Sequence, residues 1–236
     1  MCIRDSGIYG DAVEEIDWST GQIIKVLKEL GIDDNTLVIF TSDNGADGGG
    51  SNAPLRNEKG STWEGGMRVP CVMRFEGKIP AGRVCRQVCS AMDFLPTLAH
   101  LAGTEPAKDR KIDGKDIWPL MSDAPGAKSP HEAFYYYQLD QLQCVRSGKW
   151  KLHLPMEVKK TNWGEPEGKT PLKLYDLETD IHEDHNVADE HSDVVGRLLA
   201  LADKMRKDIG DAGVKGKNQR PAGWVKNPKP QLMKSQ

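Results

Sequence analysis

An amphipathic helix that leads directly into a short apolar strand constrains the fold of this chain more than any other feature of its sequence. Between residues 9 and 30, apolar side chains recur at steps near three and four or their multiples, which is typical of a helix, and Gly31 follows as a stop signal. The next segment, residues 36–41, is β-branched and aromatic without polar alternation, as expected of a strand covered on both faces in a parallel sheet. A helix followed by a buried strand predicts an α/β layer.

Further patterns extend this layer and predict a second unit. Residues 69–75 are expected to form a strand, and residues 92–101 a helix with Pro96 in or near its first turn. A proline-rich loop follows, and beyond it the pattern changes to short strands and a final helix that can cover one face of a sheet. The strands are expected at 134–137, 143–145, 150–154 and 173–177, with a turn at Ser147-Gly148, and the helix at about 191–209.

These patterns predict an α/β fold in two parts and a tail. Residues 7–130 are expected to form the C-terminal part of a mixed sheet sandwiched by helices, and residues 131–210 a small antiparallel sheet with one packed helix. Residues 211–236 are rich in basic residues, glycine and proline, and we expect a flexible surface tail. Because a helical pattern begins almost at once with no strand before it, we expect a truncated chain in which Met1–Ser6 is a non-native leader.

Charge, apolar runs and cysteines exclude several classes of function. With 32 basic and 35 acidic side chains the formal net charge is -3, which argues against general attraction to nucleic acid or anionic membrane. No apolar stretch approaches the roughly 20 residues that span a bilayer. The five cysteines lack Cys-x-x-Cys spacing, so we expect neither a disulfide framework nor a zinc site, but buried free thiols. Any anion recognition must therefore be local.

The motif Ser42-Asp43-Asn44-Gly45 stands at the carboxyl end of the first predicted strand, where open parallel sheets place their ligand sites. Asp43 offers carboxylate oxygens and Asn44 a carbonyl oxygen, both hard ligands suited to calcium or magnesium. Taken alone, Asp-Asn-Gly is more typical of a plain turn.

A second cluster follows at residues 54–70, and together the two motifs resemble the sulfatase family. In that family a strand ending in Ser-Asp-Asn-Gly is followed by a loop with Gly/Glu-Lys-Gly-x-x-x-Glu-Gly-Gly-x-Arg-x-Pro, and residues 58–70 match this pattern at a compatible separation. Weaker similarity extends to residues 93–98, 148–152, 174–178 and 186–188, so that the resemblance covers most of the chain from about residue 9 to 209.

The resemblance implies a role for each matched residue. Asp43 and Asn44 would be two of the calcium ligands, and Lys59 would contact the sulfate, where preorganised positive charge stabilises the transition state of sulfuryl transfer. We interpret Glu64 and Arg68 as a buried or half-buried pair that shapes the loop.

Other polar and aromatic residues carry weaker signals. Two interpretations of Arg56 stay open: a cation that faces the substrate, and an exposed loop residue. The spacing of His182, His185 and His191 does not favour a metal site, and the aromatic side chains at 135–137 and 150 are expected to pack the smaller sheet.

The chain also departs from the family pattern. Sulfatases use a formylglycine made from cysteine or serine in a Cys/Ser-x-Pro-x-Arg motif, and none of the five cysteines begins such a motif. The family's early Asp-Asp calcium ligands and the histidines and second lysine near the nucleophile are also not found, and we expect all of them in a missing upstream segment. Asp180-Ile181-His182-Glu183 replaces the common Asp-Pro-x-Glu, in a loop that we expect to lie remote from the sulfate.

The expected parent function is hydrolysis of aryl or carbohydrate sulfate esters by an enzyme that is periplasmic or extracellular. The chain by itself is expected to be inactive, because it lacks the nucleophile. Two alternatives stay open: a phosphonate monoester hydrolase or phosphodiesterase of the same superfamily, and a non-catalytic relative that binds a sulfated glycan.

Overall fold

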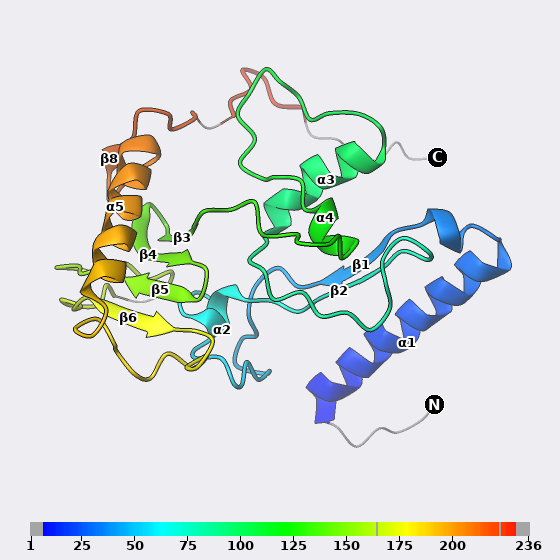
Figure 1. The fold of residues 1–236 in the computed structure, drawn as a ribbon, viewed down its shortest axis with the longest axis horizontal. Coiled ribbons are helices and arrows are strands. Elements are labelled where there is room, and N and C mark those ends of the chain that lie inside the picture. Colours follow the sequence, from blue (N-terminus) through cyan, green and yellow to red (C-terminus); the bar gives the residue numbers. More distant parts are fainter. Residues whose placement is uncertain (1–6, 164, 222, 230–236) are drawn as a thin grey trace.

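The computed structural model describes residues 7–163, 165–221 and 223–229, so the expected leader Met1–Ser6 lies outside the described residues. The first part of the chain is built around one β-hairpin (Figure 1). Helix α1 (Gly7–Glu29) leads through the 3₁₀ turn η1 (Asp33–Asn35) into β1 (Val38–Thr41), which pairs antiparallel with β2 (Cys71–Arg74). The elements η2 (Ala91–Asp93), α3 (Phe94–Leu101) and α4 (Trp118–Met121) follow, the last within the segment predicted to be loop.

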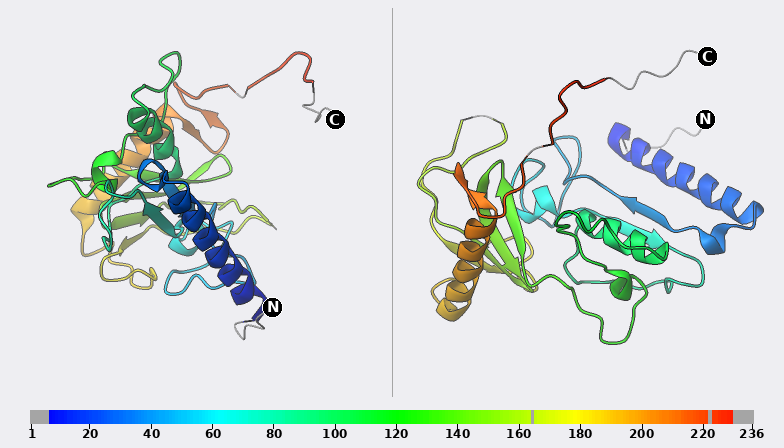
Figure 2. Two further views of the ribbon diagram at one scale, coloured as in Figure 1. Left: turned by 90° about the vertical axis from the view of Figure 1, so that its right-hand side faces the viewer. Right: turned by 90° about the horizontal axis from the view of Figure 1, so that it is seen from above.

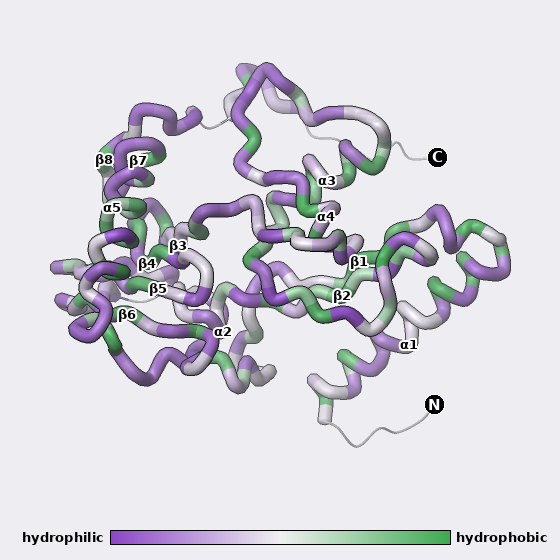
Figure 3. Tube along the Cα trace, viewed as in Figure 1, coloured by the Kyte–Doolittle hydropathy of each residue, from purple (hydrophilic) through white to green (hydrophobic). Residues whose placement is uncertain are grey.

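The expected parallel pairing of the first strand is wrong for the described residues. There, β1 pairs only with β2 and in the antiparallel sense, and Phe40 and Val72 are 39% and 65% exposed. Helix α1 has no buried residue, although hydrophobic residues recur along it (Figure 3). The absence of polar alternation indicates that a strand is apolar on both faces. This pattern does not indicate which strand pairs with it, or in which direction.

The second part is a four-stranded antiparallel sheet with a helix packed on one face (Figure 2). Its strand order is β3 (Phe134–Gln138), β4 (Gln141–Ser147), β5 (Trp150–His153) and β6 (Lys173–Asp176), and α5 (Ser192–Asp208) covers it. The buried apolar core between sheet and helix comprises Leu142, Val145, Leu152, Leu154, Leu174, Ala188, Leu198, Leu201 and Ala202. The predicted α/β fold with a small antiparallel sheet is thus confirmed, as is the turn at Ser147-Gly148 between β4 and β5.

The first residues of the predicted tail are packed against the second part. Strand β7 (Gly210–Asp211) pairs with β8 (Val214–Lys215) through a turn in which Ala212 and Gly213 both have positive φ, as in a type I′ hairpin. Asp211 Oδ1 accepts a hydrogen bond from Leu142 N at 2.8 Å. The prediction that the tail starts at residue 211 is therefore wrong for residues 211–215. Amino-acid composition, on which the prediction was based, does not reveal a hairpin of two-residue strands.

The expectation of buried thiols holds for one cysteine. Cys144 is buried, whereas Cys71, Cys85 and Cys89 are free and exposed, and Cys2 lies outside the described residues. Among the described helices, none has the length and apolar character needed to cross a bilayer.

Candidate active site

The Ser-Asp-Asn-Gly motif forms a turn directly after β1. Ser42 Oγ donates to Asn44 O at 3.0 Å, and Asn44 N donates to Asp43 Oδ1 at 3.1 Å. The Asp43 side chain is exposed and Asn44 is half-buried. Two neighbouring oxygen donors on one short turn have the chemistry that calcium requires, but six to eight oxygens normally surround this ion. Among the described residues no group of three or more His, Cys, Asp or Glu side chains is placed to hold a metal, so these two would be a minority of its ligands.

The backbone of this turn lies directly against the second motif. Gly45 N donates to Gly66 O at 3.1 Å, and a Cβ on Gly45 would stand 1.7 Å from Gly65 O. Only a residue without a side chain permits this approach. Lys59 N in turn donates to Ala46 O at 3.1 Å. The structure therefore brings the Asp43-Asn44 turn and the backbone of Lys59 together.

Asn52 closes the loop between the two motifs. Its Oδ1 accepts from Ala46 N at 2.7 Å, and its Nδ2 donates to Ala46 O at 3.0 Å and to Asn57 O at 3.2 Å. Asn52 was not predicted as a site residue. Its only signal is an asparagine within a polar loop, which is too common to single it out.

Lys59 is the cation in this loop that has no partner within the described residues. Its side chain is half-buried, and its ammonium makes no hydrogen bond or ion pair with any of them. Its backbone is fixed by the hydrogen bond to Ala46. A held backbone and an unpaired ammonium leave this position able to take an anion.

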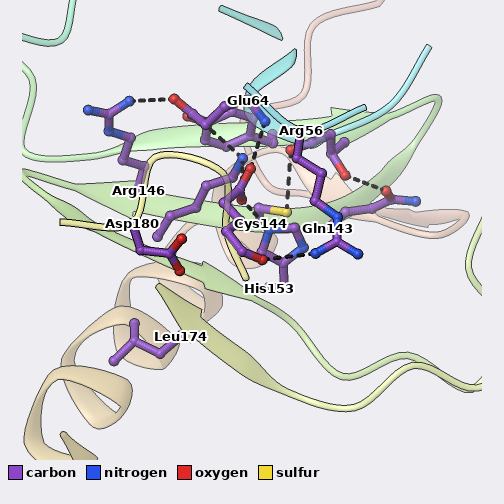
Figure 4. Close-up of polar contacts among 12 residues, drawn as sticks. Arg56, Glu64, Gln143, Cys144, Arg146, His153, Leu174 and Asp180 are labelled. Carbon is purple, nitrogen blue, oxygen red and sulfur yellow. Dashed lines mark hydrogen bonds and ion pairs between the residues drawn. The ribbon is translucent and has the colours of Figure 1, made fainter. Parts of the chain in front are cut away.

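Glu64 is buried as predicted, but it does not pair with Arg68. The Glu64 side chain is 1% exposed, with Lys151 Nζ and Tyr136 Oη each 3.0 Å from Oε1 and Arg146 Nη1 2.8 Å from Oε2 (Figure 4). Arg68 is exposed and has extended backbone directly after the four-residue helix α2 (Glu64–Met67). The predicted pair is therefore wrong, because the partners of Glu64 come from the small sheet rather than from its own loop.

Glu183 is the second carboxylate of this buried cluster. Its Oε2 accepts from Glu64 N at 2.8 Å, and its Oε1 lies 2.8 Å from His153 Nε2 and 3.0 Å from Lys151 Nζ. The Asp-x-x-Glu segment therefore contacts the loop that carries Lys59, through the backbone of Glu64, and its expected distance from the sulfate stays a prediction. Burial alone would raise the pKa of Glu183, but the hydrogen bond from His153 and the charge of Lys151 outweigh it and lower that pKa.

Arg56 joins the same contact between loop and small sheet. Its Nη1 donates to Glu183 O at 2.9 Å (Figure 4). Its guanidinium carbon lies 4.1 Å from the centre of the Trp63 ring. The side chain stays 37% exposed. Of the two readings left open by the sequence, neither describes this placement fully, because the guanidinium is held at the junction with the small sheet.

Comparison with known proteins decides the family of the chain. A family model described as Sulfatase matches residues 5–104, and a second, described as N-sulphoglucosamine sulphohydrolase, C-terminal, matches residues 57–208. The chain belongs to the sulfatase family. The two models cover both the loops around Lys59 and the small sheet, so the resemblance of the motifs reflects membership of a family of sulfuric ester hydrolases.

Individual sulfatases match over the same region. The chain is 45% identical to mouse steryl-sulfatase over 159 residues, which cover 61% of the chain and 25% of that protein. It is 46% identical to N-acetylgalactosamine-6-sulfatase of the dog over 153 residues, which cover 62% of the chain and 29% of that protein. The chain thus spans between a quarter and a third of the length of these curated relatives.

Solved structures show the same relationship in three dimensions. The structure of Ps i-CgsB in complex with k-i-k-neocarrahexaose is similar with a TM-score of 0.71 and 30% identity, over 87% of this chain and 44% of that one. The phosphonate monoester hydrolase of Agrobacterium radiobacter is similar with a TM-score of 0.53 and 28% identity, over 82% of this chain and 38% of that one.

Proposed function

We propose that residues 42–66 form one side of the active site of a sulfate ester hydrolase, in which Lys59 binds the sulfate and Asp43 and Asn44 are two of the calcium ligands. The observation that carries this proposal is the position of Lys59. Its backbone is hydrogen-bonded beside the Asp43-Asn44 turn, and its half-buried ammonium has no partner within the described residues.

The chemistry of sulfate transfer suits these residues. A sulfate ester carries negative charge on oxygens that an ammonium can approach, and charge that develops during transfer is stabilised by preorganised cations. A calcium ion, when bound, would supply further positive charge at the same oxygens. Glu64 and Arg56 are occupied by the small sheet and Glu183. Lys59 is therefore the residue of this loop that we assign to sulfate.

We further propose that the nucleophile and the other calcium ligands belong to residues outside this sequence. None of its five cysteines begins a Cys-x-Pro-x-Arg motif, so no residue here is assigned as the attacking group. The relatives are three to four times as long as the segment that matches, which leaves ample chain to supply these groups.

The test is to recover the coding sequence upstream of residue 1 and to assay the complete product. We expect a modifiable Cys/Ser-x-Pro-x-Arg motif and hydrolysis of a sulfate ester. A complete product without that motif that still binds a sulfated glycan would favour the non-catalytic alternative.

The rival activity is hydrolysis of a phosphonate monoester. The structural similarity to the Agrobacterium radiobacter enzyme supports this alternative. The complete product should therefore be assayed with an aryl sulfate, a sulfated monosaccharide and a phenyl phosphonate monoester in parallel. A higher kcat/KM for the phosphonate than for both sulfates would replace the proposed function by the rival.

A further inference from the structure

An exposed tryptophan lies on the backbone directly after the proposed sulfate-binding lysine. Trp163 is 63% exposed, and a Cβ on Gly60 would stand 2.2 Å from its ring atom Cζ3. The indole therefore rests on Gly60, the residue that follows Lys59. Single exposed hydrophobic side chains are common on protein surfaces, and Trp18 and Trp224 are also exposed here, so the feature that distinguishes Trp163 is its contact with the residue after Lys59.

Two buried glutamines fix the segment of Trp163 relative to the Lys59 loop. Gln143 is 1% exposed, and its amide accepts from Thr62 Oγ1 at 2.9 Å while donating to Lys160 O at 2.8 Å (Figure 4). Gln138 is 5% exposed. With its amide in the orientation that its neighbours require, it donates to Gly60 O at 3.2 Å and accepts from Asn162 N at 3.0 Å. Each glutamine thus joins one residue near Lys59 to one residue near Trp163.

The segment of Trp163 is also held by its own pairing and by a third glutamine. The two arms, residues 156–163 and 165–170, are joined by backbone hydrogen bonds between Lys159 and Glu167 at 3.0 and 2.9 Å. Gln141, 7% exposed, donates to Val158 O at 2.9 Å and accepts from Lys160 N at 2.8 Å. The sheet therefore uses three buried amides to hold a surface segment. Burying a polar group costs free energy unless it is hydrogen-bonded, so these satisfied amides hold the residues that precede Trp163 in a defined position on the sheet.

From this geometry we propose that Trp163 is the platform for the alcohol part of the substrate, and that this part is a sugar ring; the inference rests on the proposed role of Lys59 in binding the sulfate. An indole face is flat and apolar with one polar edge, which matches the face of a pyranose that carries C–H groups. Because Gly60 follows Lys59 directly, a sugar ring whose sulfate is bound by Lys59 can reach the indole that lies on Gly60.

The surroundings of the indole favour a sugar over a sterol or a simple aryl group. Asn162 is exposed next to Trp163; its Nδ2 lies 3.0 Å from the amide oxygen of Gln138, and the rest of its side-chain amide can hydrogen-bond a ligand. The Trp163 ring is open to solvent, whereas a purely apolar alcohol gains most from an enclosed apolar pocket. A flat aromatic surface with hydrogen-bonding groups at its rim is suited to a hydroxylated ring.

Binding to the chain itself tests this assignment without a need for turnover. Indole N–H resonances report on Trp163, assigned by comparison with Trp163→Phe, and side-chain resonances report on Lys59. The probes are a 6-sulfated N-acetylhexosamine, the same sugar without sulfate, 4-nitrophenyl sulfate and inorganic sulfate. We expect the sulfated sugar to move both the Trp163 and the Lys59 resonances, and inorganic sulfate to move only those of Lys59.

Variants separate the ring contact from the sulfate contact. Trp163→Ala should weaken binding of the sulfated sugar about five- to ten-fold and leave inorganic sulfate unchanged. Lys59→Ala should weaken both. Trp224→Ala is the matched control, because Trp224 is also exposed, at 79%, and lies outside the segment, and it should change neither. Trp163→Phe should retain part of the affinity for the sugar.

The outcomes distinguish this inference from the proposed function. Sulfated sugar that leaves the Trp163 resonance in place, or that binds Trp163→Ala as well as the parent chain, would overturn the platform whatever happens at Lys59. Tighter binding of 4-nitrophenyl sulfate through Trp163 would overturn the choice of a sugar. Unchanged binding of inorganic sulfate by Lys59→Ala would instead contradict the proposed function.

Discussion

The ammonium of Lys151 lies 3.0 Å from Oε1 of Glu64 and contacts no solvent, although 87 residues separate the two in the chain. It lies equally close to Glu183 Oε1. One buried cation therefore joins the loop of Lys59 to the small sheet and to the Asp-x-x-Glu segment. This contact makes the sheet part of the support for the proposed site.

Replacing Lys151 by methionine should destabilise the chain severely. The change leaves two buried carboxylates without their shared cation, which typically costs about 3–5 kcal/mol. Lys149→Met is the matched control: Lys149 pairs with Asp176 at 2.6 Å but is 37% exposed, and exposed pairs contribute about 0–1 kcal/mol. Urea unfolding of both variants gives the comparison. Equal losses would mean that the buried cluster is no more important than a surface pair.

Stability should also fall in acid through Glu183. Its pKa in the folded chain lies below the ordinary value of 4.5, so the folded state binds fewer protons than the unfolded state in this range. The contribution of Glu183 is therefore complete above its unfolded pKa and is lost as the pH falls through its folded pKa. The gap in unfolding free energy between the parent and Glu183→Gln should narrow below about pH 4.5. Glu157→Gln is the control for the loss of one carboxylate, because this side chain is 82% exposed and its exposed ion pair contributes about 0–1 kcal/mol.

The close approach of the two motifs predicts that a side chain at Gly45 destabilises the fold. In Gly45→Ala the new Cβ would overlap Gly65 O, which is backbone and cannot rotate away, so the loop must shift. We expect a loss of about 1–3 kcal/mol, as for other overpacked sites. Gly48→Ala lies in the same loop with nothing within 4 Å of the new Cβ, and it should be close to neutral. A thermal melt of both variants decides the matter, and a Gly45→Ala chain as stable as the parent would refute the close approach.

The sequence predicted the elements better than their partners. Periodicity identified α1, the two strands of the first hairpin, the four strands of the sheet and α5, because the spacing of apolar residues is a local property. It could not show that β1 pairs antiparallel with β2, since a strand that is apolar on both faces has the same composition in either arrangement.

The same limit applied to the site. Asp43, Asn44 and Lys59 stand out through local motifs, and a backbone hydrogen bond joins Lys59 to Ala46, two residues after Asn44. The partners of the Glu64 carboxylate and the contact of Gln143 with Thr62 join residues 72 to 87 positions apart, for which one sequence carries no signal. The matched family motif suggested a pair with Arg68 instead, and this pairing was wrong.

Calcium should bind only weakly to the chain by itself. Asp43 and Asn44 supply a minority of the six to eight oxygens that the ion takes, and the described residues hold no further acidic cluster for it. Isothermal titration calorimetry should detect no strong calcium site. Turnover of an aryl sulfate should also be absent, because no residue of this sequence is assigned as the nucleophile. Micromolar binding that Asp43→Ala abolishes would show that the remaining ligands lie within this sequence.

The decisive prediction concerns Lys59 in a complete enzyme that contains this chain. Its ammonium has no partner among the described residues, so Lys59→Ala should cost little stability, whereas the proposed sulfate contact would be lost. Removing one preorganised charge contact of this kind typically lowers the rate by about 10²–10³-fold, or roughly 3–4 kcal/mol of transition-state stabilisation.

Steady-state kinetics and a thermal melt of the same variant separate the effect on the rate from the effect on stability. Parental kcat/KM would exclude Lys59 from the active site, and a large fall in Tm with a proportionate loss of activity would make its role structural. A rate loss at unchanged Tm leaves the sulfate contact as the explanation, because the loop is held through the backbone of Lys59 and alanine keeps that hydrogen bond.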